Sequence, residues 1–472
     1  MSKSIAIMWF RQDLRLSDNP ALLAASKHEN ILPIYILDDE NAGEMKMGAA
    51  SRFWLHHSLN SLKSSLPELC VYQGDAIEII DSLSKRYTIE AIYWNRCYEP
   101  WRISRDKIIK EKMHKQDIHV ESFNASLLWE PWTIFKEDKT PYKVFTPFYR
   151  KGCLKSTPPR QVLPQPSSLN GVIDNQALTI DMLNLLPENR WDIELAKHWE
   201  IGEKGAQVAL ARFIDNGLSN YKKGRNFPAK KHTSHLSVHI HFGEISVHQI
   251  WDQIQSLPSD DNTDHFCSEL GWREFSYSLL YQQPELPTKN LQTKFDNFPW
   301  QNNPMLLDAW RKGKTGFPIV DAGMRQLWQT GYVHNRLRMV VGSFLVKNLL
   351  IDWRYGERWF WDCLVDADHA NNSASWQWVA GCGADAAPYF RIFNPITQGE
   401  KFDPDGSFTK KYIPELAHLP VKYLFSPWMA PSEVLAEANV TLGVNYPHPI
   451  VDLKASRETA LAAFSDLGKK EI

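Results

Sequence analysis

The chain has 472 residues, which predicts two or three domains because single hydrophobic cores rarely grow past about 250–300 residues. A net charge of −2, with 43% hydrophobic and 23% charged residues, excludes a disordered chain and a generally basic surface, so any nucleic-acid binding must use a local patch. The six dispersed cysteines predict reduced thiols and no metal site, and the lack of an apolar run near about 18 residues predicts a cytoplasmic protein without a membrane span.

Apolar runs alternate with helical patterns over the first 130 residues. The runs that predict strands are residues 5–10, 31–37, 69–72, 91–94 and 119–123. A helix should begin at Asn19 and Pro20, an N-cap followed by proline at the first helical position. Further helical patterns cover residues 55–66, 76–86 and 104–115. This alternation predicts an α/β domain over residues 1–130, a doubly wound, Rossmann-like parallel sheet.

The loop after the first strand disfavours a dehydrogenase. A dinucleotide fingerprint would place glycines there, whereas this chain has the run Phe10–Arg15. The α/β domain is therefore not expected to bind a nicotinamide dinucleotide.

Two further regions follow the α/β domain. Residues 131–199 contain four prolines between positions 158 and 166 and few periodic apolar positions, so we expect an irregular interdomain linker. From about residue 200 helical periodicity dominates, including the stretch from Val333 to Leu350 and a helix over residues 456–467. We therefore expect an all-α domain over residues 200–472.

The region from Trp353 to Asn394 concentrates side chains suited to an aromatic redox cofactor. Five of the chain's 19 tryptophans lie there, namely Trp353, Trp359, Trp361, Trp376 and Trp378. They stand near Asp366, Asp368, the pair Asn371-Asn372 and the run Ala387–Pro395. Because indoles stack on flat π-systems and are easily oxidised, the cluster predicts a bound aromatic redox cofactor.

The segment Thr233-Ser234-His235-Leu236-Ser237 carries three hydroxyls in five residues. At an expected helix start, hydroxyls and backbone amides could hold a diphosphate, and Tyr221 and Arg225 upstream could stack and pair with phosphate. The same residues equally fit a Ser/Thr-rich helix cap.

Two other helical patterns carry polar groups on one face. Asn335, Arg338 and Met339 share a face through their i, i+3 and i+4 spacing, and an aspartate of the 366–368 segment could pair with Arg338 as a structural salt bridge. Glu269 and Trp272 are i, i+3 neighbours beside Arg273, a pattern that also fits a core tryptophan with an exposed glutamate.

Together these segments resemble the photolyase and cryptochrome flavoprotein family, and most closely the class I cyclobutane pyrimidine dimer photolyases. The resemblance runs nearly end to end. In chain order it is carried by Trp9–Leu16, Tyr142–Pro147, Gly271–Phe275, Phe317–Ala322, His334–Met339 and Trp376–Pro395.

The resemblance implies one FAD, folded into a U shape in the helical domain and active as the reduced anion. The residues that match the family's flavin contacts are Tyr221, Thr233, Ser234, Leu236, Ser237, Arg273, Arg338, Asp366, Asp368 and Asn372. Asn372 corresponds to the residue that faces the isoalloxazine N5.

The resemblance also implies a deoxyribodipyrimidine photo-lyase, which repairs cyclobutane pyrimidine dimers in DNA by electron transfer from photoexcited reduced FAD. The implied catalytic residues are Glu269, Trp272, Asn335, Met339, Asn372 and Trp378. The implied DNA-binding residues are Arg225, Trp272, Asn335, Arg336, Trp378 and Arg391, and the three arginines would hold phosphates. We expect the protein to act as a monomer.

Trp376, Trp353 and Trp300 match the family's electron-transfer chain from the flavin to the surface, although three core tryptophans would look the same. At two other places this chain departs from the motifs of the family. Trp101 and Arg102 stand where folate-binding relatives carry Asn and Glu, which disfavours a methenyl folate antenna and leaves a deazaflavin, a second flavin or no antenna open. His235 replaces the usual arginine of the Thr-Ser-x-Leu-Ser motif and changes the local charge.

Several alternatives stay open. A cryptochrome would sense blue light and signal through a partner, usually with a long C-terminal tail. A six-four photoproduct photolyase would show two adjacent histidines where His334-Asn335 stands, and a DASH-type cryptochrome would lack the Asn335–Met339 pattern. An adenylate-binding domain fused to an RNA-binding helical bundle belongs to a different class, and the colour of the purified protein distinguishes it.

Overall fold

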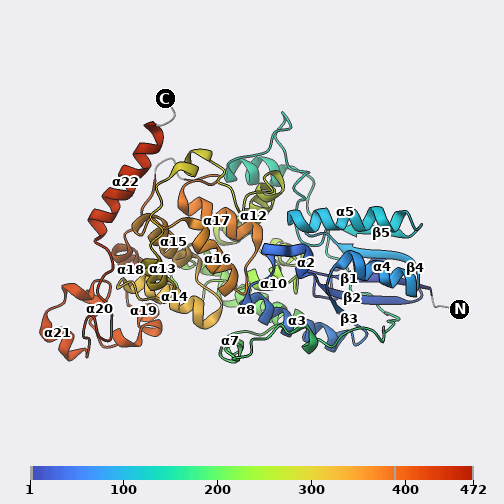
Figure 1. Cartoon of the computed structure of the whole chain (residues 1–472), viewed down its shortest axis with the longest axis horizontal. Coiled ribbons are helices and arrows are strands. Elements are labelled where there is room, and N and C mark those ends of the chain that lie inside the picture. Colours follow the sequence, from blue (N-terminus) through green and yellow to red (C-terminus); the bar gives the residue numbers. More distant parts are fainter. Residues whose placement is uncertain (1–3, 387–389, 470–472) are drawn as a thin grey trace. The chain divides into compact units, whose positions relative to one another are not determined.

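The computed structural model describes residues 4–386 and 390–469, which form two compact units (Figure 1). The first unit contains the described residues up to Ser219, together with Ser234–Pro284 and Val365–Ala370. The second contains Asn220–Thr233, Glu285–Leu364 and the described residues from Asn371 onward. The residues Ala387-Pro388-Tyr389 of the tryptophan-rich region lie outside the described residues.

A five-stranded parallel sheet forms the core of the first unit and confirms the predicted doubly wound α/β fold. Its strands are β1 (Ser4–Phe10), β2 (Ile31–Leu37), β3 (Cys70–Gln73), β4 (Thr88–Asn95) and β5 (His119–Phe123). The strand order is β3-β2-β1-β4-β5, and every neighbouring pair is parallel. The chain therefore reverses direction across the sheet between β1 and β4, the position at which open α/β sheets usually bind ligands.

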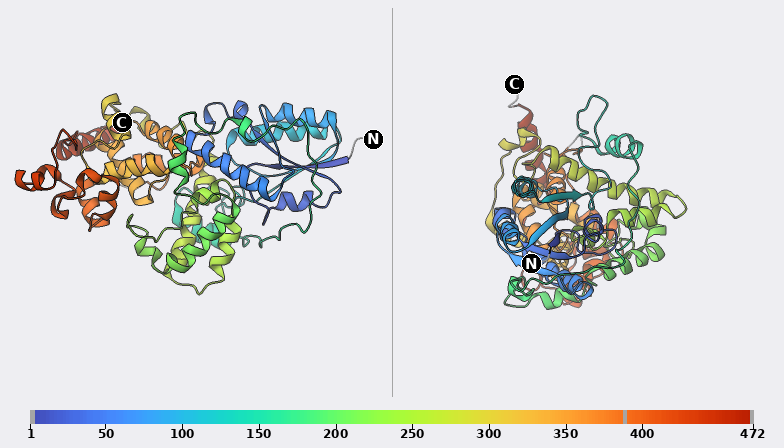
Figure 2. Two further views of the ribbon diagram at one scale, coloured as in Figure 1. Left: turned by 90° about the horizontal axis from the view of Figure 1, so that it is seen from below. Right: turned by 90° about the vertical axis from the view of Figure 1, so that its right-hand side faces the viewer.

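Helices cover both faces of the sheet, as the left view of Figure 2 shows. They are α1 (Pro20–Ala25), α2 (Asp39–Ala42), α3 (Ala49–Ser65), α4 (Ala76–Arg86) and α5 (Pro100–His114). α1 and α3 share one apolar core with alternate strand residues such as Met8, and α4 and α5 share the other core with residues such as Ile7. The predicted helix start is confirmed, because the Asn19 side chain accepts a hydrogen bond from the Leu22 amide and Pro20 occupies the first helical position.

Helices dominate the described residues from about 200 onward, which confirms the predicted helical region, and shorter helices lie in the preceding connection. In chain order they are α6 (Phe145–Pro147), α7 (Asp192–Ala196), α8 (Glu203–Asn216), α9 (Tyr221–Gly224), α10 (Ser237–His241), α11 (Val247–Gln255), α12 (Asp261–Gln282), α13 (Pro304–Arg311), α14 (Pro318–Thr330), α15 (Asn335–Ser343), α16 (Trp353–Cys363), α17 (His369–Ala380), α18 (Pro395–Phe402), α19 (Ser407–Tyr412), α20 (Val421–Leu424), α21 (Ser432–Glu437) and α22 (Leu453–Lys469). A π-helical turn, Phe344–Asn348, follows α15. Within the described ranges, no helix is long and apolar enough to span a bilayer.

The buried guanidinium of Arg15 joins the loop after β1 to the helical part of the same unit. It donates to the carbonyl oxygens of Ser17, Asp18, Ala125 and Gly243. Gly243 has φ +66°, and a Cβ there would lie 2.1 Å from the Gln12 carbonyl oxygen. Only glycine therefore allows the turn after α10 to lie this close to the loop.

The irregular connection of residues 131–199 is attached to the sheet by short bridges and one buried carboxylate. Gly171 bridges to Ile31, and Leu178 bridges to Val71. Between them, Asp174 accepts hydrogen bonds from both terminal nitrogens of Arg86 at 2.8 Å and from the Tyr72 hydroxyl at 2.6 Å. Burial alone would raise the pKa of Asp174, but these bonds lower it to about 2. The expected domain boundaries at 130 and 199 stay a prediction.

Asp174→Asn should lower the free energy of unfolding by about 2 kcal/mol at pH 7, because the folded-state pKa of about 2 lies below the ordinary value of 3.8. A depressed carboxylate pKa contributes stability that is complete above 3.8 and is lost as pH falls toward 2. Melting temperatures of the variant and the wild type should therefore converge over that window. A gap of constant size between pH 6 and pH 2.5 would contradict this role.

Candidate functional site

The turn that leads into α10 contacts the acidic 366–368 segment within the first unit. Ser237 begins α10, and its hydroxyl donates to Asp366 Oδ2 at 2.6 Å. Ser234 Oγ accepts from the Leu236 amide, and His235 between them has φ +54°. The segment is thus a tight turn in which hydrogen bonds hold the side chains of Ser234 and Ser237. The hydroxyl of Ser237 is already hydrogen-bonded to Asp366.

Asp368 lies in a polar network built on α12. The Tyr277 hydroxyl donates to its Oδ2, and His241 Nδ1 lies 3.8 Å from the same oxygen. Burial by itself would raise the pKa of Asp368, but His241, the Arg273 charge and the Tyr277 hydroxyl together lower it. The Arg273 guanidinium lies over the Tyr277 ring and donates to the Ser126 carbonyl. Asp368 therefore stays a carboxylate at neutral pH and can accept hydrogen bonds.

Glu274, an acid on α12, has a pKa that is shifted in the opposite direction to that of Asp368. Glu274 accepts from the Trp129 amide at 3.0 Å and from Arg273 at 3.2 Å. Burial raises the pKa of Glu274 to about 7, in spite of these partners. Of the other predicted residues here, Glu269 lies 3.7 Å from His265 one turn away, and Trp272 is half-buried.

Asn372 is held by α16 in the second unit. Its side-chain nitrogen donates to the Glu357 carbonyl oxygen at 3.0 Å, and the adjacent Ser373 hydroxyl donates to the Glu357 carboxyl at 2.8 Å. An amide anchored through its nitrogen keeps its carbonyl oxygen as an acceptor. Burial raises the pKa of Glu357 to about 7, and the Ser373 hydrogen bond opposes this shift.

Of the three arginines predicted to hold phosphates, Arg336 is affected by the charges of the other two, which belong to the same second unit. Burial and then the charges of Arg225 and Arg391 lower the pKa of Arg336. Arg336 donates to Asn226 Oδ1 at 2.5 Å, and its guanidinium lies 4.3 Å from the centre of the Phe402 ring. Like charges gathered in this way favour an anionic ligand.

The other predicted residues of the second unit occupy defined places. Asn335 starts α15 after the His334 N-cap, and Met339 Sδ lies 3.6 Å from Arg336 Nη1. Arg338 donates to the Val333 carbonyl oxygen at 2.9 Å. Whether Arg338 also pairs with an aspartate stays a prediction. Tyr221 is buried beneath the Arg225 guanidinium, and Thr233 lies in the turn that follows.

The three predicted electron-transfer tryptophans differ in exposure. Trp376 and Trp353 are buried at 3% and 0% exposure, and Trp300 is half-buried against Phe298. Trp353 Nε1 donates to Asn290 at 2.9 Å. Trp378, predicted for the dimer pocket, donates from Nε1 to the Asp385 carbonyl oxygen. The partial exposure of Trp300 is compatible with its predicted place as the last tryptophan of an electron-transfer chain that ends near solvent.

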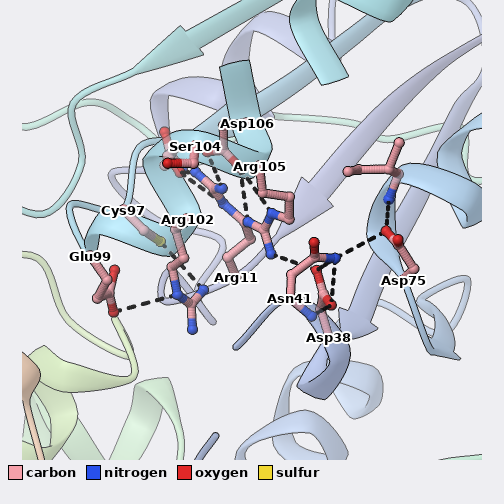
Figure 3. Close-up of polar contacts among 12 residues, drawn as sticks. Arg11, Asp38, Asn41, Asp75, Cys97, Glu99, Arg102, Ser104, Arg105 and Asp106 are labelled. Atoms are coloured by element: carbon pink, nitrogen blue, oxygen red, sulfur yellow. Dashed lines mark hydrogen bonds and ion pairs between the residues drawn. The ribbon is translucent and has the colours of Figure 1, made fainter. Parts of the chain in front are cut away.

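Figure 3 shows a second polar cluster, at the carboxyl ends of the central strands. Arg11 follows β1 and pairs with Asp106, while Arg105 pairs with both Asp106 and Asp38, which follows β2. Arg102 Nε lies 3.4 Å from Glu99, and its guanidinium lies over the ring of Trp101 at 4.7 Å. Trp101 and Arg102, which depart from the folate-binding pattern, thus contact each other at the point where the sheet reverses direction.

The sequence patterns did not indicate several residues that contact the predicted site residues and hold them in place. Tyr277 lies one helical turn after Arg273, a spacing that could have revealed it, whereas Asn290 and Glu357 are far in sequence from their partners. Lys347 is buried, donates to the Arg391 carbonyl oxygen and lies under the Phe390 ring. Burial lowers the pKa of Lys347 to about 7.

Two family descriptions match the chain. "DNA photolyase" matches residues 6–167, and "FAD binding domain of DNA photolyase" matches residues 266–466. The first covers the parallel sheet, and the second covers most of the helical region that contains Arg273, Asp368 and Asn372.

Known proteins match nearly the whole chain. A deoxyribodipyrimidine photo-lyase of Agrobacterium fabrum is 46% identical over 98% of this chain and 98% of its own length. Cryptochrome-2 of Arabidopsis thaliana is 36% identical over 99% of this chain and 79% of its own length. The crystal structure of a bacterial class III photolyase from Agrobacterium tumefaciens has a TM-score of 0.95 and 45% identity, covering 99% of this chain and 98% of that one.

Glu357→Gln should change the pH dependence of stability in the direction opposite to Asp174→Asn. The folded-state pKa of about 7 exceeds the ordinary 4.5, so wild-type stability is complete below 4.5 and declines as pH rises toward 7. The variant lacks this ionisation and should gain about 3 kcal/mol relative to the wild type between pH 4 and pH 8. Thermal unfolding across that range measures the difference. Glu458→Gln on an exposed position of α22 should give curves parallel to the wild type, and parallel curves for Glu357→Gln would refute the assignment.

Proposed function

This chain belongs to the photolyase and cryptochrome family, and from that premise we propose that it repairs cyclobutane pyrimidine dimers in DNA with blue light and FAD. The family and the fold class predicted from the motifs are confirmed. The lesion, the class within the family and the residue roles are our proposals. The observation that carries the proposal is the 46% identity, over 98% of both chains, with a protein named deoxyribodipyrimidine photo-lyase. The charges of Arg225 and Arg391 near Arg336 support a local DNA-binding patch in a protein whose net charge is only −2.

The residues present fit FAD. We propose that Ser234 and the backbone of the tight turn around His235 hold the diphosphate, and that Tyr221 and Thr233 also contact FAD. Asp366 and Asp368 would then accept hydrogen bonds from the sugar or the flavin edge, and the low pKa of Asp368 makes that carboxylate a strong acceptor at neutral pH. Asn372, anchored through its nitrogen, presents its carbonyl oxygen to the flavin N5.

The chemistry that bound, reduced FAD supplies is light-driven electron donation to the dimer and recovery of the electron after ring opening, so no net redox change results. The chain's own residues bind and orient the lesion. Trp272 and Trp378 offer flat surfaces to the pyrimidines, Glu269 and Asn335 hydrogen-bond their polar edges, and Met339 adds an adaptable apolar contact. Photolyases are among the enzymes known to extrude their target from the duplex, and extrusion costs less for a damaged base than for an intact one.

The three arginines hold backbone phosphates, and they do so without reading the base sequence. Damage is then recognised by the stacking and hydrogen-bonding residues. This division explains how a protein with a nearly neutral total charge binds DNA, because a local cluster supplies the positive potential.

Related proteins named cryptochrome leave light signalling as the second candidate function. A second chromophore near Arg102 and Trp101 is a further proposal, supported by the position of that cluster at the sheet reversal. A deazaflavin, a second flavin or no antenna stay open as alternatives, and the monomeric state stays a prediction.

The repair assay decides between the candidates. Purified holoprotein should restore thymines in a dimer-containing oligonucleotide under blue light and none in darkness, because binding needs no photons and ring opening does. A matched oligonucleotide with a six-four photoproduct should stay unrepaired. Repair of the six-four product alone would assign the other photolyase activity, and flavin photochemistry without repair would favour a light sensor.

Trp376→Phe should abolish photoreduction of oxidised flavin in the presence of an external reductant, because phenylalanine is far harder to oxidise than tryptophan. Repair by chemically reduced enzyme should persist, since it uses a different electron path. Absorption spectra during illumination measure photoreduction. Trp54→Phe, a buried tryptophan of the α/β core, is the control and should photoreduce normally. Photoreduction by Trp376→Phe at the wild-type rate would contradict the assignment.

A further inference from the structure

Trp272 belongs to a stack of three aromatic rings in the first unit, and the other two rings, Phe145 and Tyr149, have no role in the repair scheme. Phe145 lies parallel to Trp272, with ring centroids 3.9 Å apart and 12° between the planes. Tyr149 lies parallel to Phe145 at 5.7 Å and 7°. Phe145 and Tyr149 are buried, whereas Trp272 is half-buried. Phe145 thus covers one face of the indole, and part of the indole surface stays accessible.

The backbone on both sides sets the spacing of this stack. Phe145 and Tyr149 are one helical turn apart, on α6 and the π-helical turn Phe148–Gly152 that continues it. Gly271 precedes Trp272 on α12, and a Cβ at Gly271 would lie 2.5 Å from the Tyr149 ring. The absence of a side chain at Gly271 therefore lets α12 pack directly on Tyr149.

The stack also connects two sequence segments that carried the family resemblance. No residue of Tyr142–Pro147 is among the predicted site residues. Of Gly271–Phe275, only Trp272 and Arg273 are predicted site residues. In the structure, Phe145 from the first segment contacts Trp272 from the second. Their joint occurrence has a physical reason, because each segment supplies one side of the same stack.

We propose that Phe145 is a positioning residue for lesion recognition, which holds the Trp272 indole so that its accessible surface stacks on the extruded dimer. The proposal rests on the proposed function, since it deepens the role of Trp272 there. An indole that is already held flat loses less conformational freedom when a base stacks on it. Undamaged DNA keeps its bases in the duplex, so Phe145 should affect discrimination between damaged and undamaged DNA.

Three holoprotein variants test this role. Phe145→Leu removes the flat surface behind Trp272 and keeps an apolar side chain, whereas Phe145→Tyr keeps the ring. Phe148→Leu is the matched control, because Phe148 is also buried, lies three residues after Phe145 and packs on Phe275 and Tyr142. Dissociation constants for dimer-containing and undamaged oligonucleotides are measured in darkness, with flavin content and melting temperature alongside.

Phe145→Leu should lower the preference for dimer-containing DNA roughly 3- to 10-fold, while Phe145→Tyr and Phe148→Leu stay within about twofold of the wild type. Repair per absorbed photon at saturating substrate should not change, because Phe145 orients the indole and does not carry the electron. Arg336→Ala, which removes a proposed phosphate contact, should instead weaken binding of both DNAs alike.

A double-mutant cycle gives the sharpest readout. In a Trp272→Leu background, Phe145→Leu should cause no further loss of preference, because Phe145 acts through Trp272. The inference is overturned if Phe145→Leu keeps the wild-type preference, if Phe148→Leu lowers it equally, or if the two losses add. A wild type without any preference for dimers would defeat the proposed function and this inference together, whereas a preference that survives Phe145→Leu would defeat the inference alone.

Discussion

The packing of the first unit depends on the hydrogen bonds that the buried Arg15 guanidinium makes to the backbone. The Arg15 guanidinium donates to four carbonyl oxygens, at Ser17, Asp18, Ala125 and Gly243, and burial lowers its pKa. An unpaired buried charge would be very costly, so these segments are held together wherever the protein is folded. The bond to Gly243 joins the loop after β1 to the turn after α10, and Ser237 on α10 in turn holds Asp366. The α/β sheet and the turn proposed to contact the flavin are therefore parts of one compact body.

The buried acids among the candidate site residues and their partners differ in the direction of their pKa shift. The direction depends on whether burial or the surrounding charges and hydrogen bonds have the larger effect. Asp368 is buried among a hydroxyl, an arginine and a histidine, and its pKa is lowered. Glu274 and Glu357 are also buried, but burial outweighs their partners, and the pKa of each rises to about 7. Asp368 is therefore ionised at neutral pH, whereas Glu274 and Glu357 change their ionisation close to neutral pH. The same chemical group thus differs in charge state because its surroundings differ.

Tryptophan side chains stand in three distinct environments in this protein. Trp376 and Trp353 are enclosed and held by specific contacts, such as the bond from Trp353 to Asn290, which suits a fixed electron-transfer path. Trp272 is half-buried and backed by Phe145, which suits a surface that stacks on a ligand. Trp101 contacts the guanidiniums of Arg102 and Arg105 and belongs to a charged cluster. The tryptophans of this chain therefore do not share one kind of environment.

The sequence by itself determined the elements and the family. Continuous apolar runs located the strands, and period-3.6 patterns located the helices, including α4 at residues 76–86. The Asn19 cap was also found, because these features depend on neighbouring residues. The family followed from six motifs in one order. Only the tertiary structure decided which groups meet: Ser237 with Asp366, Tyr277 with Asp368, Asn372 with the Glu357 carbonyl oxygen, and Phe145 with Trp272. These partners are far apart in sequence, and no local pattern records the direction in which a side chain points once the helices have packed.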